Sequence, residues 1–396
     1  MNQNKQKIFT QLISIATCGK LADLLISAKT TLPWLLASLG APTWIVSLLV
    51  PIRESGSLIP QWPLRQKTKH IKNRLIMWRW GIAIQACAMC LMLVTALFTE
   101  ALAAGLLILL SLLILSLGRS LSSLSMKDIQ GLNIEKGHRG KLVGTASSLS
   151  GLLSLITAGL LLFSPKDMSL EAMQLLITFS AVLLLVSLLL SLGLTANLSD
   201  DQNASLDGKN TWKIFHQDRD LRHLIINRCL LLHAALIAPF FVSASATNSD
   251  FFQLPYFIIA SALASFLSSY LWGKMADISA IRTLFWATLV CVSAAFTFYF
   301  VTSLNNWLFD IFLFFALNLG YAGIRTGRKT YILDIARGSQ RTLYVAAANS
   351  MVGYVLLMLG GLYALLYVAI GEHIILIMTA AMLIGLLHTF NMKAEK

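Results

Sequence analysis

The chain has few charged residues for its length. Asp, Glu, Lys and Arg make up 12% of its 396 residues, and hydrophobic residues make up 57%. That charged share is about half of what is usual in a soluble domain. Acidic residues are the scarcer class, with 18 Asp and Glu against 31 Lys and Arg. Because a soluble fold this apolar could not cover its own surface, the composition excludes a soluble protein and favours a polytopic membrane protein.

The chain also lacks the motifs of the main enzyme classes. It has no G-x-x-x-x-G-K-[ST] nucleotide-binding loop, no H-E-x-x-H zinc motif and no G-x-S-x-G nucleophile turn. Its five cysteines all lie in apolar stretches, and the C-x-x-C of Cys87 and Cys90 has no histidine partners, so it predicts packing and not a metal or redox pair. We therefore expect no enzyme activity, no cofactor and no metal.

Apolar segments recur along the whole sequence. A bilayer core needs roughly 20 apolar residues per helix. Twelve segments approach this requirement, and they lie near residues 9–38, 44–64, 75–98, 102–126, 142–164, 170–195, 222–245, 253–274, 282–303, 307–331, 342–368 and 373–391. The predicted fold class is an all-α polytopic membrane protein with twelve transmembrane helices.

Basic residues collect on one side of these segments. Lys166 is the only basic residue in the short connections on the other side. Since loops rich in Lys and Arg stay in the cytoplasm, we expect both termini to be cytoplasmic and the chain to lie in the plasma membrane, which is the inner membrane in a bacterium. The net charge of +13 then reflects topology and attraction to anionic lipid, and no nucleic-acid partner is expected.

The segments divide into two sets of six. The one long polar connection, at 197–222, is rich in Asp, Asn, Ser and Gly and predicts a cytoplasmic linker. It separates an N-terminal six-helix bundle, residues 1–196, from a C-terminal six-helix bundle, residues 223–396.

An internal repeat relates the two halves. Residues 115–151 align without a gap to residues 317–353, at a constant offset of 202, with nine identical pairs that include Gly118 and Gly320. The fourth and fifth spans therefore correspond to the tenth and eleventh. We expect parallel pseudo-repeats related by an axis along the membrane normal.

These features resemble the major facilitator superfamily. The 6+6 plan and the long central loop fit it, and so do the loop after the eighth span and the turn from the tenth span into the eleventh. The residues that match the family's gating-loop motifs are Gly273, Asp277, Arg282, Asp334 and Arg341. The chain departs from the pattern at Ile278 and Ala280, and the equivalent first-half loop has Arg65 and Lys69 where Gly and Asp would stand.

Polar residues concentrate in a few spans. The resemblance implies that the first, fourth, seventh and tenth spans line a central cavity. Spacings of three and four residues place Lys20, Asp23 and Ser27 on one helix face, and the second span adds charges near mid-depth. The candidate substrate-cavity residues are Lys20, Asp23, Ser27, Arg53, Glu54, Arg119, Arg228, His233 and Arg325.

A structural interpretation stands beside each functional one. The charges of the first two spans can pair only to neutralise one another, and His233 can be a packing residue. Arg119, Arg228 and Arg325 can face lipid phosphates at the membrane surface. The positive surplus favours an anionic or zwitterionic ligand, because an uncompensated charge inside a membrane is expensive.

We therefore expect a secondary active transporter of a small organic solute, anionic or zwitterionic, that works by alternating access as a monomer. Protons are the expected coupling ion, and Asp23 or Glu54 the expected carrier. The alternative is a membrane protein that keeps the fold without transporting, such as a receptor or an assembly factor. We also expect Lys20 and Asp23 to interact with Arg53 and Glu54 near the membrane midplane, and the exchange Asp23→Arg with Arg53→Asp to be tolerated better than either single change.

The orientation is testable by cysteine labelling. A single cysteine introduced at Asp167 should react with a membrane-impermeant reagent added outside intact cells. A single cysteine at Ser205 should react only after the cells are opened. Labelling at position 205 and not at 167 would contradict the predicted topology.

Overall fold

The chain folds into helices. The computed structural model describes residues 3–61, 63–64, 73–134, 139–163, 169–194, 218–248, 253–301, 307–335 and 340–392. Every regular element within these ranges is a helix. Each of the twelve predicted segments overlaps at least one helix, which agrees with the predicted fold class.

The chain divides into two compact units. Unit 1 consists of Met1–Pro42 and Ile52–Ala204, and unit 2 of Thr43–Pro51 and Ser205–Lys396. Residue 196 lies outside the described residues, so the predicted domain boundaries stay a prediction. Helix α10 already begins at Arg219, inside the predicted linker.

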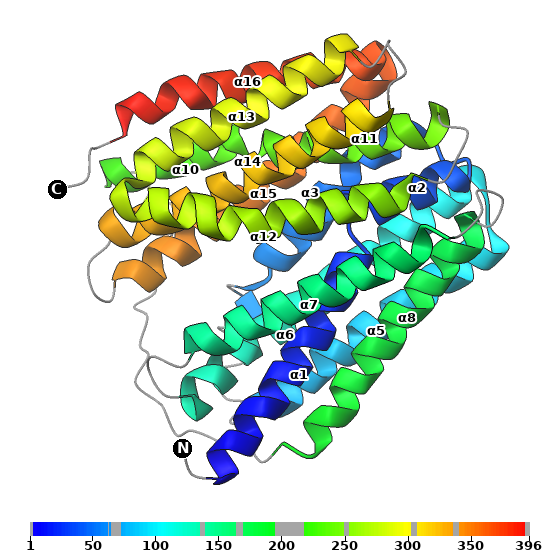
Figure 1. Cartoon of the computed structure of the whole chain (residues 1–396), viewed down its shortest axis with the longest axis vertical. Helices are drawn as coiled ribbons and strands as arrows, with labels where there is room; N and C mark the ends of the chain where they lie inside the picture. Colours follow the sequence, from blue (N-terminus) through cyan, green and yellow to red (C-terminus); the bar gives the residue numbers. More distant parts are fainter. Residues whose placement is uncertain are drawn as a thin grey trace. The chain divides into compact units, whose positions relative to one another are not determined.

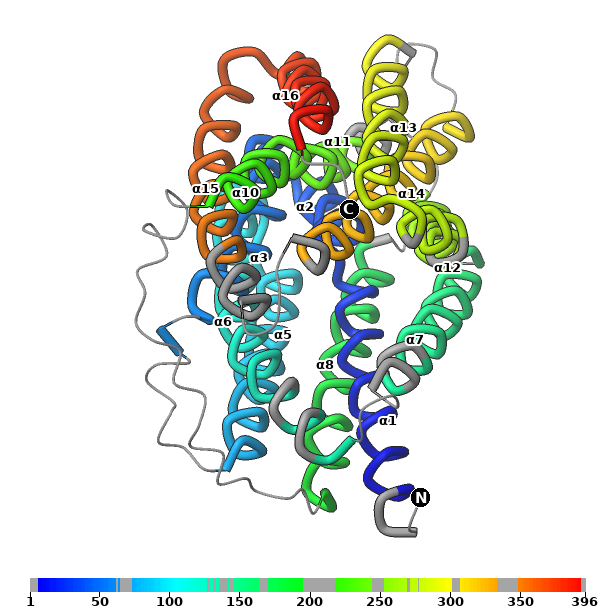
Figure 2. The backbone as a smooth tube through the Cα atoms, turned by 90° about the vertical axis from the view of Figure 1, so that its left-hand side faces the viewer, coloured from blue at the N-terminus to red at the C-terminus, as the bar shows by residue number. Residues whose placement is uncertain are grey.

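Unit 1 is built mainly from six helices. They are α1 (Gln3–Leu25), α2 (Thr31–Ser38), α5 (Arg74–Phe98), α6 (Ala101–Asn133), α7 (Arg139–Leu161) and α8 (Ser169–Leu192). Helices α1 and α8 lie side by side, as α5 and α6 do (Figures 1 and 2). Helix α3 (Val46–Leu58) begins in unit 2 and continues into unit 1.

Unit 2 contains the other helices of the described chain. They are η1 (Thr43–Ile45), α10 (Arg219–Leu231), α11 (His233–Asn248), α12 (Leu254–Ile278), α13 (Ala280–Val301), α14 (Trp307–Ile335), α15 (Gln340–Ile370), η4 (Gly371–His373), α16 (Ile374–His388) and η5 (Thr389–Asn391). Helix α14 packs against both α12 and α13.

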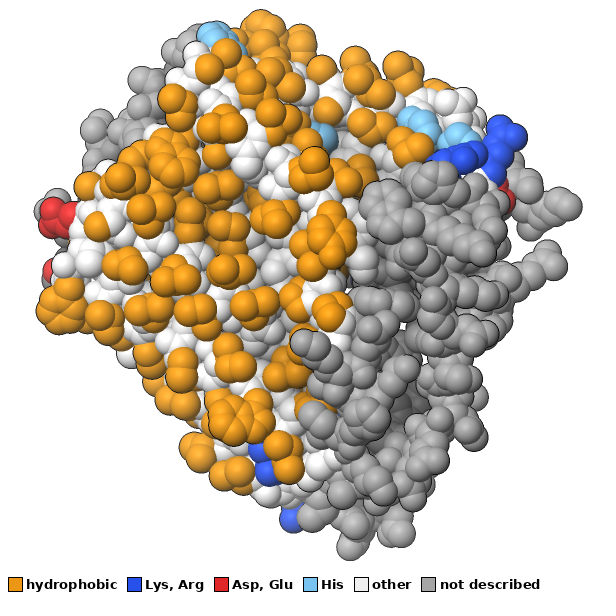
Figure 3. Space-filling view, turned by 180° about the vertical axis from the view of Figure 1, so that it is seen from behind, with side chains coloured by type: hydrophobic (Ala, Val, Ile, Leu, Met, Phe, Trp, Pro, Cys, Tyr) orange, Lys and Arg blue, Asp and Glu red, His pale blue; other side chains and the backbone are white. Residues whose placement is uncertain are grey.

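Nine stretches of the described chain are long and apolar enough to cross a membrane. Helix α3, with 13 residues, and the apolar part of α7, residues 145–161, are too short to be among them, and the eleventh and twelfth spans form one continuous stretch, Ala348–Asn391. Hydrophobic side chains cover most of the described face in Figure 3, and the few charged ones lie at its edges. The chain is an integral membrane protein. Lys166 and most of the linker lie outside the described residues, so the orientation stays a prediction.

The first span is a broken helix, whereas the seventh span, Arg219–Ser243, continues through one turn residue, Leu232, whose backbone is still helical (φ −60°, ψ −27°). Helix α1 ends at Leu25 and α2 starts at Thr31, whereas α10 and α11 are separated at Leu232. The expectation that Ser27 continues the helix face of Lys20 and Asp23 is wrong, because the helix stops before Ser27.

Glycines allow close helix packing at equivalent points of the two units. A Cβ atom at Gly118 of α6 would lie 2.8 Å from the carbonyl oxygen of Gly81 on α5. A Cβ atom at Gly320 of α14 would lie 2.7 Å from the carbonyl oxygen of Ala287 on α13. Since backbone cannot yield as a flexible side chain can, these repeat-related glycines fix the fourth and tenth spans against their neighbours.

Alanine substitution tests this packing. We expect Gly118→Ala and Gly320→Ala each to lower the free energy of unfolding by about 1–3 kcal/mol, the usual penalty for overpacking. Gly151→Ala on α7 is the matched control, because nothing lies within 4 Å of a Cβ atom there. Thermal unfolding of the purified protein in detergent measures the difference. Equal midpoints for all three variants would contradict the packing argument.

Candidate functional site

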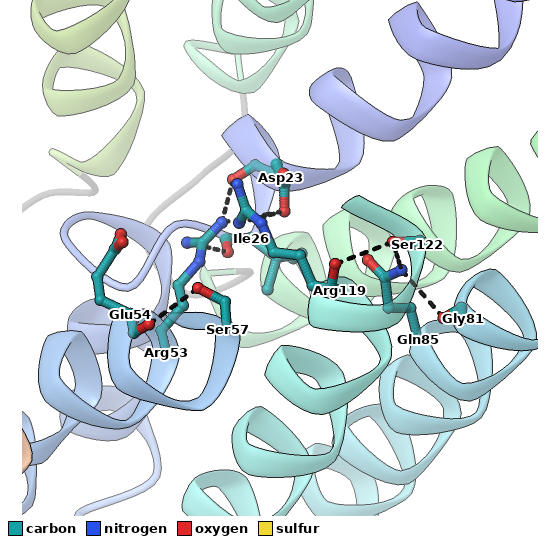
Figure 4. Close-up of polar contacts among 9 residues, drawn as sticks. All are labelled: Asp23, Ile26, Arg53, Glu54, Ser57, Gly81, Gln85, Arg119 and Ser122. Carbon is teal, nitrogen blue, oxygen red and sulfur yellow. Dashed lines mark hydrogen bonds and ion pairs between the residues drawn. The ribbon is translucent and has the colours of Figure 1, made fainter. Parts of the chain in front are cut away.

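The side chain of Asp23 lies between two arginines in unit 1. Its Oδ1 atom accepts a hydrogen bond from Arg53 Nη2 at 3.1 Å and another from Arg119 Nη1 at 2.9 Å. Figure 4 shows the carboxylate at the meeting point of α1, α3 and α6. One acidic group therefore holds three helices that lie far apart in the sequence.

Arg53 also caps the broken end of α1. Its Nη1 atom donates to the carbonyl oxygen of Ile26 and its Nη2 atom donates to the carbonyl oxygen of Asp23, both at 3.1 Å. The last carbonyls of a helix have no partner inside the helix. Arg53, whose side chain is 10% exposed, supplies those donors and places a positive charge at the negative end of the helix dipole.

Glycine positions Arg53 next to Arg119. Gly56, one turn after Arg53 on α3, lies directly against Ser116, one turn before Arg119 on α6. A second contact steadies α6, where Gln85 Nε2 donates to Ser122 Oγ at 3.0 Å and Ser122 Oγ donates to the carbonyl oxygen of Arg119 at 3.2 Å (Figure 4). The two arginines thus approach the same carboxylate from two close-packed helices.

Glu54 is the second acidic residue of this cluster. It interacts electrostatically with both Arg53 and Arg119, and its carboxylate lies on the far side of Arg53 from Arg119 (Figure 4). Its carbonyl oxygen accepts a hydrogen bond from Ser57 Oγ at 2.9 Å. Asp23, Glu54, Arg53 and Arg119 together carry no net charge when both acids are ionised. Of the contacts predicted among Lys20, Asp23, Arg53 and Glu54, the one between Asp23 and Arg53 is present, and Arg119 joins it.

Lys20 and Arg228 have partners at repeat-equivalent positions. Lys20 Nζ donates to Ser147 Oγ on α7, and Arg228 Nη1 donates to Asn349 Oδ1 on α15 at 2.8 Å. The repeat offset maps Ser147 onto Asn349. Neither partner was among the predicted site residues. Their pairing in the repeat alignment was the signal that could have found them.

His233 is the first residue of α11 and directly follows Leu232 in the seventh span. Its Nδ1 atom lies 2.7 Å from the carbonyl oxygen of Leu230, and its Nε2 atom lies 2.5 Å from the hydroxyl oxygen of Tyr363 on α15. A carbonyl only accepts, so Nδ1 carries the proton and Nε2 accepts from Tyr363 when the ring is neutral. His233 therefore ties the seventh span to α15.

The remaining predicted residues are spread over unit 2. The guanidinium carbon of Arg325 lies 5.7 Å from the centre of the Tyr321 ring on the same helix. Gly273 is on α12, and Arg282 is exposed on α13. Asp277, Asp334 and Arg341 lie in helices, but their side chains are outside the described residues, so the gating-loop roles stay predictions. Among the described residues no three His, Cys, Asp or Glu side chains are grouped to hold a metal.

Comparison with solved structures identifies the fold. The chain superposes on the nucleoside transporter NupG with a TM-score of 0.72 and 12% identity, covering 98% of this chain and 99% of that one. It superposes on a D-xylose-proton symporter with a TM-score of 0.72 and 11% identity, covering 99% and 98%. A bacterial homologue of the iron transporter ferroportin gives a TM-score of 0.67 at 14% identity, covering 99% of both chains. No protein-family profile and no curated protein sequence matches the chain. The chain has the major facilitator fold.

The two arginines should differ in their effect on stability. We expect Arg53→Gln to lower the free energy of unfolding by about 1–3 kcal/mol, because it removes the donor of two backbone carbonyls and one of the two arginines paired with the Asp23 carboxylate. Arg119→Gln should cost clearly less, since the Arg119 side chain is 36% exposed. Lys7→Gln, an exposed position on α1, is the control. Thermal unfolding ranks the variants, and an equal loss for both arginines would contradict the assigned roles.

The structure also changes the expected effect on stability of exchanging the charges of Asp23 and Arg53. Arg53 donates to two backbone carbonyls as well as to the Asp23 carboxylate. An aspartate at position 53 cannot donate to those carbonyls. The exchange of Asp23→Arg with Arg53→Asp is therefore not expected to restore stability, contrary to the expectation from the sequence.

Proposed function

We propose that the chain is a secondary active transporter that moves a small anionic or zwitterionic organic solute by alternating access, coupled to protons through Asp23. The observation that carries the proposal is the carboxylate that Arg53 and Arg119 share at the break of the first span. Of the two arginines, Arg119 is the more exposed, with 36% of its side chain accessible, so it is the one that a ligand can reach.

The charges suggest an order of events. A proton on Asp23 removes the negative charge that holds Arg119, whereas Arg53 keeps its two backbone acceptors. Arg119 is then free to bind an anionic group of the solute, and the planar guanidinium matches a carboxylate or a phosphate bidentately. Loss of the proton restores the Asp23 ion pairs and releases the solute. Glu54, which interacts with both arginines, is the second candidate carrier.

Solved structures with the same fold support a transport role. The printed descriptions of three of them name a nucleoside transporter, a D-xylose-proton symporter and an iron transporter homologue. Their substrates differ, so these structures do not indicate which substrate this chain would transport. The alternative function, a receptor or an assembly factor without transport, has no residue in its favour among the described ones. Solute-dependent flux in sealed vesicles separates the two.

Neutral substitutions test the proton carrier. We expect Asp23→Asn and Glu54→Gln each to impair proton-driven uptake in vesicles with an imposed pH gradient. A true carrier mutant should keep exchange of labelled for unlabelled solute, because exchange needs no net proton movement. If both variants transport at the parent rate with an unchanged pH profile, the cluster is only structural and coupling lies elsewhere.

Arg119→Gln tests the charge of the solute. If Arg119 binds an anionic group, this variant should weaken binding of an anionic ligand at least tenfold more than binding of a neutral analogue. Ligand-dependent thermal shifts of the purified protein measure both affinities, since a ligand that binds only the folded state raises its stability. Equal losses for the two ligands would assign Arg119 a structural role instead.

A further inference from the structure

Helix α14 carries three cations in five consecutive residues. Arg325, Arg328 and Lys329 follow a long apolar stretch of the tenth span. Arg325 and Lys329 are exposed, and Arg328 is half-buried. Like charges three and four residues apart on a helix repel one another, and Lys329 interacts repulsively with both arginines. Electrostatic repulsion among these three side chains therefore destabilises this part of α14.

Packing fixes which way these cations point. Gly320, Gly323 and Gly327 recur at spacings of three and four, and each lies against α13, with Gly323 also against Trp272 of α12. At 100° per residue Arg325 and Lys329 project from the opposite side of α14, and Arg328 lies at the flank of that side, about 70° away. The contacts with α12 and α13 therefore leave the cationic side turned away from those two helices.

In the repeat alignment, this side of α14 corresponds to the side of α6 that carries the site of unit 1. The offset of 202 maps Arg119 onto Tyr321, and Gly118 onto Gly320. In unit 1 the side of α6 that carries Arg119 meets Asp23. In unit 2 the equivalent side carries Tyr321, whose ring lies 5.7 Å from the guanidinium carbon of Arg325. Each unit thus presents a cation on the same side of its fourth helix.

The number and kind of cations indicate the ligand chemistry. A carboxylate carries one charge, and one arginine saturates it bidentately. A phosphate monoester carries about −1.5 to −2 charges and three strong acceptor oxygens, so it matches a cluster of several donors. Two arginines and one lysine within five residues exceed what a carboxylate needs.

We propose that Arg325, Arg328 and Lys329 bind a phosphate monoester group, and that the transported solute supplies it. The proposal rests on the proposed transport function and narrows its substrate to small organic phosphates. A lipid headgroup offers the same chemistry, and it is a serious competitor because Arg325 lies about 27 Å along α14 from Trp307, close to the thickness of a bilayer core. The experiment must therefore separate a soluble phosphate from a lipid phosphate.

The test measures binding of inorganic phosphate to the full chain in nanodiscs of phosphatidylcholine. The unfolding midpoint is followed against sodium phosphate, sodium acetate and sodium chloride at equal ionic strength. We expect phosphate to raise the midpoint in a saturable way and acetate to do so much less. Arg325→Gln with Lys329→Gln should weaken the phosphate effect at least tenfold. Lys274→Gln, an exposed lysine on α12, should leave it unchanged.

Each other outcome overturns the proposal. Equal effects of phosphate and acetate reject the phosphate class, and an unchanged effect in the double variant rejects the site. Stabilisation only in nanodiscs that contain phosphatidic acid assigns the cluster to lipid. If the double variant does not fold, Arg325→Gln alone is compared with Arg325→Lys, which retains the charge and should retain most of the binding.

Failure of this inference can be told apart from failure of the transport function. Phosphate binding is an equilibrium measurement and needs no flux. Asp23→Asn should keep phosphate binding while losing proton-driven uptake. Uptake of a solute without phosphate would uphold transport and reject the substrate class.

Discussion

The structure of unit 1 depends on one carboxylate that is shared by two arginines. Asp23 is the point at which α1, α3 and α6 meet, and its partners reach it only because of other features. Helix α1 must end at Leu25 so that its last carbonyls face Arg53. Helices α3 and α6 must approach at Gly56 and Ser116 so that both arginines reach one oxygen. The helix break, the close packing and the charges are therefore a single arrangement.

The repeat explains which parts of this arrangement recur in unit 2. Close helix packing is repeated, since Gly118 and Gly320 each lie against the backbone of the neighbouring helix. The polar acceptors Ser147 and Asn349 are repeated as well. The acidic residue is not repeated, because the seventh span has no Asp or Glu after Asp220. The scaffold is thus common to both units, and the acid–arginine cluster belongs to unit 1.

Part of the fold and part of the candidate site could be predicted from the sequence, for physical reasons. Apolar length predicted the helices, and similar depth in two neighbouring spans predicted the contact of Asp23 with Arg53. The break after Leu25 was missed, although Pro33 in the first turn of α2 was a signal for a helix boundary just before it. The approach of Arg119 to Asp23 could not be predicted, since it depends on the packing of a helix 96 residues away. Polar partners such as Tyr363 were missed because one hydroxyl on an apolar helix gives no periodic signal.

The charge of the cluster links the proton to the anion under the proposed function. The four groups Asp23, Glu54, Arg53 and Arg119 sum to zero when both acids are ionised, and to +1 when Asp23 is protonated. An anion that binds to the protonated cluster returns the sum to zero, so each ligand favours the other. By thermodynamic linkage the two effects must be equal, and couplings of this kind are typically ~1–3 kcal/mol. Because the low dielectric of the membrane makes an uncompensated charge costly, the proton and the anion are expected to bind together and to leave together.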